Sequence, residues 1–154
     1  MSNIFNADFQ DFIQALNNNQ VKYILVGGYS VILHGYSRTT GDMDIWVKKD
    51  KENYLLLVNA FREFRMPVFD MSEDNFINNP DVDVFTFGLA PVCIDLMTNV
   101  KGLDFEDAYM HSQIHWIESL SIRILSYEDL LIAKKASARP RDLDDIEKLR
   151  KKGK

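Results

Sequence analysis

Two aspartates, Asp42 and Asp44, stand one residue apart at the start of an apolar run, and they are the residues of this sequence best suited to chemistry. Residues i and i+2 of a strand point to the same face of a sheet, so we expect the two carboxylates side by side, with Met43 and Ile45 on the opposite face. Two such charges repel each other, and burying them unpaired is costly. Because no Lys or Arg adjoins them in the sequence, the pattern predicts a divalent cation that prefers oxygen ligands, Mg²⁺ or Mn²⁺.

A glycine pair, Gly27 and Gly28, lies upstream of these aspartates, between the apolar stretch VKYILV and the amphipathic stretch YSVILHGY. Glycine permits positive φ and a close approach of the backbone to a ligand. The N–H groups at the start of a helix suit a phosphate, and Ser30 adds a hydroxyl donor in the first turn. The pair matches neither the dinucleotide-binding nor the P-loop glycine pattern. Together with the carboxylates, it predicts a phosphate cradle that faces a metal site.

A third carboxylate, Asp95, interrupts the apolar stretch VCIDLM. A charged residue in such a strand is rarely buried without a partner, and a neighbouring strand would bring it beside the first two. Three carboxylates can hold two Mg²⁺ ions roughly 3.5–4 Å apart, as in two-metal phosphoryl transfer. Asp81 and Asp83 form a competing pair, which we interpret as residues at the start of a strand because they follow a proline turn.

The aspartate pair also has a plainer explanation, in which Asp42 caps the turn after Gly41 and Asp44 is merely exposed, since Asp is common at turns. The glycine pair upstream favours the metal site. The other reactive residue types are predicted to be structural. His34, His111 and His115 lack metal-ligand spacing, Trp46 and Trp116 fit a core or an interface, and Cys93 fits a small core residue.

The elements that must position these residues alternate between strands and helices. Apolar periodicity predicts helices over 7–16, 29–36, 53–64 and 104–112, strands over 21–26, 43–48, 81–88, 91–97, 114–118 and 121–125, and C-terminal helices over 126–138 and 140–152. The strands over 81–88 and 91–97 should form a hairpin. Ser126 with Asp129 fits a capping box, and Pro140 fits the first turn of a helix. This order predicts an α/β or α+β fold, with a mixed sheet flanked by helices.

The composition is that of one globular domain, which we expect to span residues 1–154 with a helical tail from about residue 126. No apolar run approaches the roughly 20 residues that cross a membrane, and the N-terminus lacks signal-peptide features. One cysteine fits a reducing cytoplasm.

The net charge of −5 divides into +5 for residues 134–154 and −10 for the rest. An acidic body with a basic tail can hold both cations and phosphates, although charged termini are usually solvated.

The run from Val26 through Gly27 and Gly28 to the Asp-Met-Asp-Ile segment resembles the signature of the DNA polymerase β superfamily of nucleotidyltransferases. Arg38 and Thr39, before the acidic pair, resemble the aminoglycoside- and lincosamide-type members and the bacterial toxin–antitoxin and abortive-infection members. The tail is similar to the last helices of that group, with Lys134, Arg139 and Asp142 at the corresponding positions, and Asp95 matches the third-carboxylate strand. The resemblance covers roughly residues 20–150.

The resemblance implies a nucleotidyltransferase fold and the transfer of a nucleoside monophosphate from an NTP to an acceptor hydroxyl. Asp42 and Asp44 would bind the metal, and Asp95 would complete the second metal site and act as general base. Gly27, Gly28 and Ser30 would cradle the β- and γ-phosphates. Lys134 would contact phosphate, unless it is an ordinary exposed lysine. Arg38 would pair with phosphate or with Asp142, unless it belongs to a structural ion pair.

The acceptor is not evident from the sequence. Drug-modifying relatives usually carry an acceptor-binding domain or complete the site by dimerising, so a homodimer or a partner protein would be needed here. A catalytically inactive module that binds a partner, like an antitoxin, is the alternative function. A nucleic-acid binder ranks last, because the basic tail lacks interleaved aromatics and the acidic body repels phosphates.

Overall fold

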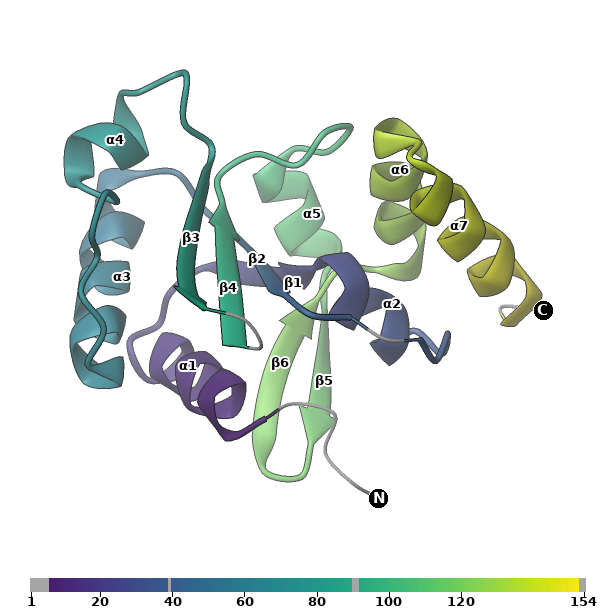
Figure 1. The fold of residues 1–154 in the computed structure, drawn as a ribbon, viewed down its shortest axis with the longest axis horizontal. Coiled ribbons are helices and arrows are strands. Elements are labelled where there is room, and N and C mark those ends of the chain that lie inside the picture. The colour runs from purple at the N-terminus through teal and green to yellow at the C-terminus, as the bar shows by residue number, and fades with distance from the viewer. Residues whose placement is uncertain (1–5, 39, 90–91, 153–154) are drawn as a thin grey trace.

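The computed structural model describes residues 6–38, 40–89 and 92–152, which form a six-stranded mixed sheet with helices on both faces (Figure 1). The strands lie in the order β3-β4-β2-β1-β6-β5. Their bounds are β1 (Tyr23–Val26), β2 (Met43–Val47), β3 (Val84–Leu89), β4 (Val92–Met97), β5 (Gln113–Ile117) and β6 (Leu120–Ile124). The pairs β1–β6 and β2–β4 are parallel, and the other three pairs are antiparallel. The predicted mixed sheet and the β3–β4 hairpin are confirmed, although residues 90 and 91 of the link lie outside the described ranges.

Seven helices are formed by the described residues. Their bounds are α1 (Ala7–Asn18), α2 (Gly27–Leu33), α3 (Lys51–Phe64), α4 (Glu73–Ile77), α5 (Phe105–His111), α6 (Tyr127–Ser137) and α7 (Pro140–Lys152). Side-chain caps begin several of them, and Ser126 accepts from the backbone N–H of Asp129 at 3.1 Å as predicted. Pro140 is the first residue of α7, as expected. The helix α4 is missing from the sequence prediction, because its five residues bury only Phe76 and show no apolar period.

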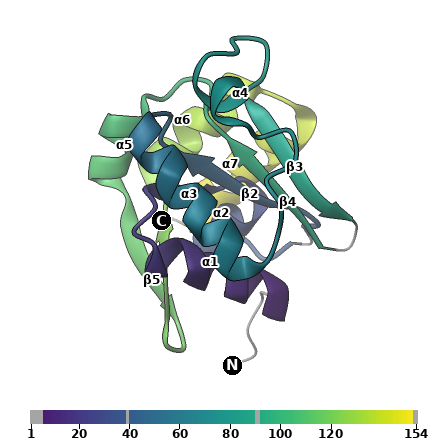
Figure 2. The same cartoon turned by 90° about the vertical axis from the view of Figure 1, so that its left-hand side faces the viewer.

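One face of the sheet is covered by α1 and α3 (Figure 2). Strand residues Met43 and Ile45 point into this core together with Phe12 of α1 and Phe61 of α3, and all four are buried. This places Met43 and Ile45 on the face opposite Asp44, as the two-residue period requires.

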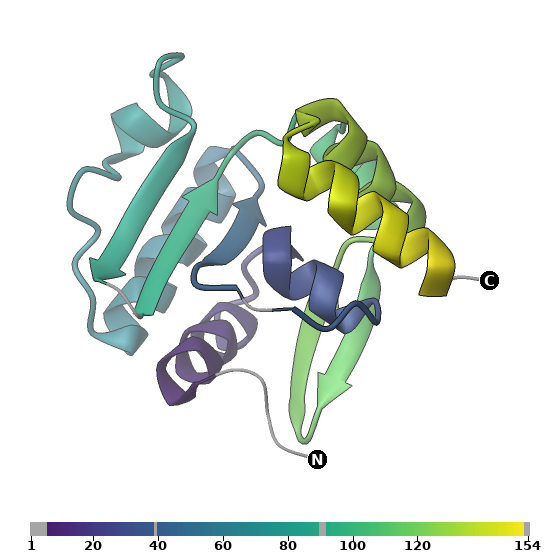
Figure 3. The ribbon, with the colours of Figure 1, turned by 45° about the vertical axis from the view of Figure 1, so that its right-hand side comes forward.

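The other face is covered by α2, α5, α6 and α7 (Figure 3). Ile24 and Trp46 of the central strands pack with Leu130 of α6 and Leu149 of α7. The C-terminal helices are therefore part of the second core, and the surface that they cover is the one from which Asp44 projects. Trp46 is a core residue as expected. Trp116 on β5 is 63% exposed, which excludes it from the core of this chain and leaves the interface role a prediction.

The remaining structural predictions concern single side chains and the membrane. His34 Nε2 donates a hydrogen bond to the carbonyl oxygen of Leu125 at 2.7 Å, and His111 Nδ1 lies 3.4 Å from Asp129 Oδ2. Cys93 is half-buried. Over the described ranges, the chain has no helix whose length and apolar character would let it cross a membrane.

Candidate functional site

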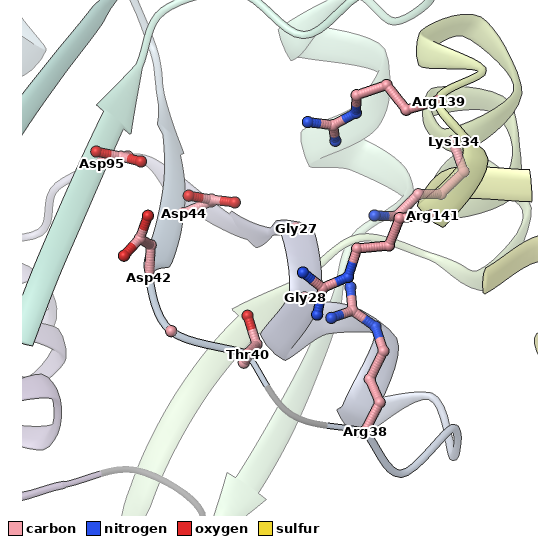
Figure 4. Close-up of a pocket in the computed structure, with 11 residues that line it drawn as sticks. Gly27, Gly28, Arg38, Thr40, Asp42, Asp44, Asp95, Lys134, Arg139 and Arg141 are labelled. Atoms are coloured by element: carbon pink, nitrogen blue, oxygen red, sulfur yellow. The ribbon is translucent and has the colours of Figure 1, made fainter. Parts of the chain in front are cut away.

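The three aspartates meet because of strand register. Strands β2 and β4 are parallel neighbours, and Asp44 is paired with Asp95 across them. Asp42 lies in a bend one residue before β2, which agrees with the predicted strand bounds of 43–48. All three line one cavity of about 300 Å³, and Figure 4 shows their carboxylates gathered on one side of it. The expected convergence of the three residues is therefore confirmed.

The glycine pair lies beside these carboxylates, at the end of β1 and the start of α2. Gly27 has a φ of +69°, and a Cβ there would clash with Oδ2 of Asp44. Gly28 is not among the described glycines with positive φ, but a Cβ there would clash with Thr40. Gly27 is thus needed both for its backbone conformation and for space, whereas Gly28 is needed for space alone.

Four cationic side chains line the side of the cavity opposite the aspartates (Figure 4). They come from different elements and are Arg38 of the α2–β2 loop, Lys134 of α6, Arg139 of the α6–α7 link and Arg141 of α7. The remaining lining residues are Thr40 and Gly41. The cavity therefore has an acidic and a basic side, with the glycine turn between them.

Two buried carboxylates on α7, those of Asp142 and Asp145, contact Lys134, Arg139 and Arg38. Lys134 Nζ lies 3.2 Å from Asp142 Oδ1 and 3.1 Å from Asp145 Oδ2. Arg139 Nε donates to Asp142 at 2.7 Å. Arg38 Nε lies 2.9 Å from Asp145 Oδ1, and its Nη2 donates to Oδ2 at 3.1 Å.

Two sequence interpretations are corrected by these contacts. Lys134 is not an ordinary exposed lysine, since it is only 7% exposed and its charge is compensated by Asp142 and Asp145. Arg38 pairs with Asp145 and not with Asp142, because one further turn of α7 brings Asp145 under the α2–β2 loop.

Ser30 is the one predicted site residue that the structure does not bring to the cavity. It lies in α2 but is fully buried, and it is absent from the cavity lining. Asp81 and Asp83, the competing acidic pair, precede β3 and are likewise absent from the lining.

The three carboxylates of the acidic side repel one another. The pKa of Asp44 is raised to about 7, first by burial and then by the charges of Asp95 and Asp42, while the charges of Lys134 and Arg139 offset part of the rise. Asp95 is oriented by Thr86, whose hydroxyl donates to Asp95 Oδ1 at 2.7 Å. Removing negative charge from this group, or adding positive charge to it, would therefore stabilise the site.

The donor set fits a hard divalent cation. Asp42, Asp44 and Asp95 offer only carboxylate oxygens, which are the ligands that Mg²⁺ and Mn²⁺ prefer. Their mutual repulsion is the condition that a bound cation would relieve. As the side chains stand, no group of three or more His, Cys, Asp or Glu in the described part of the chain is arranged to hold a metal ion.

Sequence reasoning named Arg139 and Asp142 only as matches to the last helices of the resembled group, and it did not select Thr40, Arg141 or Asp145. A signal for Asp142 and Asp145 exists in the helical spacing of α7. Asp142 and Asp145 share the i, i+3, i+4, i+7 stripe with the apolar Ile146 and Leu149, and all four are buried. Two carboxylates on an apolar stripe indicate buried cationic partners.

Solved structures share this fold at low sequence identity. The candidate nucleotidyltransferase TM1012 of Thermotoga maritima superposes with a TM-score of 0.56 at 16% identity, over 93% of this chain and 88% of that one. The lincosamide antibiotic adenylyltransferase LnuA, solved with lincomycin, gives 0.56 at 14% identity, over 97% and 98%. An antigenic nucleotidyltransferase-like protein of Paracoccidioides brasiliensis gives 0.54 at 14% identity, over 91% and 72%.

These likenesses concern the fold, which is the α/β fold of nucleotidyltransferases. No curated protein sequence matches the chain. The sequence model of the family described as nucleotidyltransferase of unknown function, DUF6036, matches residues 6–150. That range contains the three aspartates, the glycine turn and the four cations of the cavity. The chain therefore belongs to this family of nucleotidyltransferases.

Proposed function

We propose that the protein transfers a nucleoside monophosphate from an NTP to an acceptor hydroxyl, in a reaction that depends on Mg²⁺ or Mn²⁺. The observation that carries the proposal is the opposition of three carboxylates and four cations across one cavity. A triphosphate with its divalent cation has the complementary charge distribution, since the cation meets the carboxylates and the phosphates meet the cationic side.

Asp42, Asp44 and Asp95 would hold one or two divalent cations. Such a cation polarises the α-phosphate and neutralises charge on the leaving pyrophosphate. The raised pKa of Asp44 supports this assignment, because burial first, and the charges of Asp95 and Asp42 second, disfavour a carboxylate there that has no cation beside it.

The triphosphate would lie against the glycine turn and the cationic side. At Gly27 and Gly28 the absence of side chains lets phosphate oxygens approach the backbone N–H groups. Lys134 is suited to a phosphate contact, because two of its three N–H donors face Asp142 and Asp145 and the third remains for a ligand. Arg38, Arg139 and Arg141 add positive charge for the leaving pyrophosphate. Ser30 has no part in this contact set, because its hydroxyl is buried outside the cavity lining.

In the transfer step the acceptor oxygen forms a bond to the α-phosphorus, and the bond between that phosphorus and the bridging oxygen breaks. The acceptor proton passes to the carboxylate of Asp95, and pyrophosphate leaves with the bonding electrons. Thr86 donates to Oδ1 of Asp95 and fixes its rotamer, so Oδ2 is the oxygen suited to receive the proton.

The fold shared with LnuA supports an enzyme over the alternative of a partner-binding module. LnuA is a lincosamide antibiotic adenylyltransferase, and this chain covers 98% of it. The fold that the two chains share over this span is thus compatible with adenylyl transfer. We take ATP and small hydroxyl compounds as the first donor and acceptors to assay. The need for NTP and the single cysteine favour a cytoplasmic location.

The assay incubates the purified protein with each α-labelled NTP, Mg²⁺ or Mn²⁺, and a cell extract or a panel of hydroxyl compounds. We expect labelled product and pyrophosphate in the presence of metal, and neither when the metal is chelated. Asp42→Asn keeps the shape of the side chain and removes a metal-facing charge, so its transfer should fall to background.

A thermal shift tests the site even before the acceptor is known. A ligand at 100 times its dissociation constant adds about 2.7 kcal/mol to folding stability, and each kcal/mol moves the Tm of a domain this size by roughly 2–4 °C. The wild type should therefore rise by roughly 5–11 °C with NTP and Mg²⁺, and Asp42→Asn by much less. No shift with any NTP would favour the partner-binding module, and an undiminished shift in Asp42→Asn would put the nucleotide elsewhere.

A further inference from the structure

A single buried carboxylate, that of Asp145, contacts two cavity cations that come from distant parts of the chain. Arg38 precedes it by 107 residues and lies in the α2–β2 loop, while Lys134 lies in α6. The contacts are 2.9 and 3.1 Å to Arg38 and 3.1 Å to Lys134. Asp145 is fully buried and does not line the cavity itself. It therefore lies behind the two cations, as seen from the acidic side.

We propose that Asp145 is a positioning residue of the triphosphate site, which holds Arg38 and Lys134 so that both face the phosphates of a bound NTP. This inference rests on the proposed function. Four cations around one cavity repel one another, and long side chains lose rotamer freedom when a ligand fixes them. A buried carboxylate behind two of them compensates their charge and removes that freedom before the ligand arrives, which is preorganisation.

Asp145 is a sharper test of positioning than Asp142, the other buried carboxylate of α7. Asp142 also accepts the backbone N–H of Arg139 at 3.1 Å, at the start of α7, so replacing it disturbs the helix end as well. The contacts of Asp145 are to the two cationic side chains. Replacing it removes the carboxylate that the two cations share and leaves the helix start in place.

The test is Asp145→Asn, which preserves side-chain volume and removes the charge. Titration calorimetry measures ATP and inorganic tripolyphosphate, each with Mg²⁺, and electron paramagnetic resonance measures Mn²⁺ binding without nucleotide. We expect both phosphate ligands to bind about 10–100-fold more weakly, by analogy with the loss of groups that orient metal ligands. We expect Mn²⁺ binding to stay within about twofold of the wild type, because Asp145 acts through Arg38 and Lys134 and not through the aspartates.

The matched control is Glu147→Gln, an exposed acid on the same helix that pairs with Lys151. It should bind both phosphate ligands as the wild type does. Wild-type affinity in Asp145→Asn would overturn the proposal, and so would an equal loss of Mn²⁺ and tripolyphosphate binding, which indicates general disruption.

A second comparison covers the case in which Asp145→Asn does not fold. The variant Arg38→Gln/Asp145→Asn also removes the arginine that Asp145 contacts. It is compared with Arg38→Gln alone. The double variant should bind tripolyphosphate more weakly, because Lys134 loses one of its two buried carboxylate partners and keeps only Asp142, and equal binding would overturn the proposal. If the wild type binds tripolyphosphate but transfers no nucleotide, the proposed function fails. The comparison of Asp145→Asn with the wild type then still tests whether Asp145 positions the two cations. A wild type that binds no triphosphate contradicts both.

Discussion

At Gly28 the backbone of α2 closes against the loop that leads to β2, with no room for a side chain between them. A Cβ would lie 2.8 Å from the Cβ of Thr40 and 3.2 Å from Nη2 of Arg38, and still closer to the hydroxyl of Thr40. Any side chain here would move a residue that lines the cavity. The constraint is steric, since the positive φ belongs to Gly27.

We expect Gly28→Val to fold and to lose NTP binding. The added methyl groups push Thr40 and Arg38 out of place. This should weaken ATP binding about tenfold or more, as the loss of groups that orient metal ligands does. Overpacking of this kind costs about 1–3 kcal/mol of folding stability. Titration calorimetry and urea unfolding measure the two effects.

The control for this variant is Gly35→Ala. Gly35 has a φ of +110°, but a Cβ there meets nothing within 4 Å, and the residue is absent from the cavity lining. Its replacement should destabilise through backbone strain and leave ATP affinity unchanged. Wild-type affinity in Gly28→Val would mean that phosphate does not approach this turn.

The site residues that were predicted from the sequence share one property, which is that each differs in type from the residues next to it in the chain. A carboxylate in an apolar strand, such as Asp95, and a glycine pair after a strand are anomalies within a few residues. The signal at Asp145 is weaker, because it appears only when residues 142–149 are placed on a helix, where this acid falls on the apolar stripe. Its burial depends on Arg38, which only tertiary structure brings near.

At the scale of elements, α6 and α7 are joined by charge as well as by apolar contacts. Lys134 of α6 and Arg139 of the link both contact Asp142 of α7. Burial alone would raise the pKa of Asp142, but the hydrogen bonds from Arg139 and the charge of Lys134 outweigh it and hold that pKa below its ordinary value.

This depressed pKa predicts an acid-sensitive helix pair. A carboxyl group whose pKa is lower in the folded state contributes stability above its unfolded pKa, near 3.8, and loses it as the pH falls through the folded value. The unfolding free energy of the wild type should therefore fall more steeply below about pH 4 than that of Asp142→Asn. Urea unfolding at a series of pH values measures both slopes, and equal slopes would contradict the pairing.

Elements were predictable from the sequence where an apolar period runs for several turns or a whole strand. The helix α3 shows such a period over fourteen residues, whereas α4 has five residues and one buried side chain. The capping serine of α4, Ser72, is a signal that could have revealed it, since its hydroxyl accepts from Asn75 at 3.2 Å. Short polar helices of this kind are fixed by their surroundings more than by their own pattern.

On the scale of the whole molecule, the sheet ends in two outer strands, β3 and β5. Strand β5 carries the exposed Ile114 and Trp116, which project from the same face two residues apart. Trp46 lies at the opposite extreme, at 2% exposure, with its ring 5.1 Å from that of Phe105.

The two tryptophans should differ in their access to a quencher. The Trp46→Phe variant keeps Trp116 alone, and the Trp116→Phe variant keeps Trp46 alone. Acrylamide should quench the fluorescence of the first variant several times more effectively than that of the second. Circular dichroism checks that both variants fold. A protected Trp116 in the first variant would contradict an exposed β5 and would indicate that another chain covers it.

The position of α7 along the chain also affects when the site is complete during synthesis. Asp42 and Asp44 leave the ribosome long before Asp142 and Asp145, and about 100 residues at roughly 5–20 residues per second take about 5–20 s. Asp95 leaves the ribosome about halfway through that interval and Lys134 near its end, so the acidic side is complete only in the second half, and Arg38 lacks its buried partner throughout. A nascent chain that has not yet produced α7 is therefore expected to bind a triphosphate weakly. The ability to bind nucleotide arises late in translation.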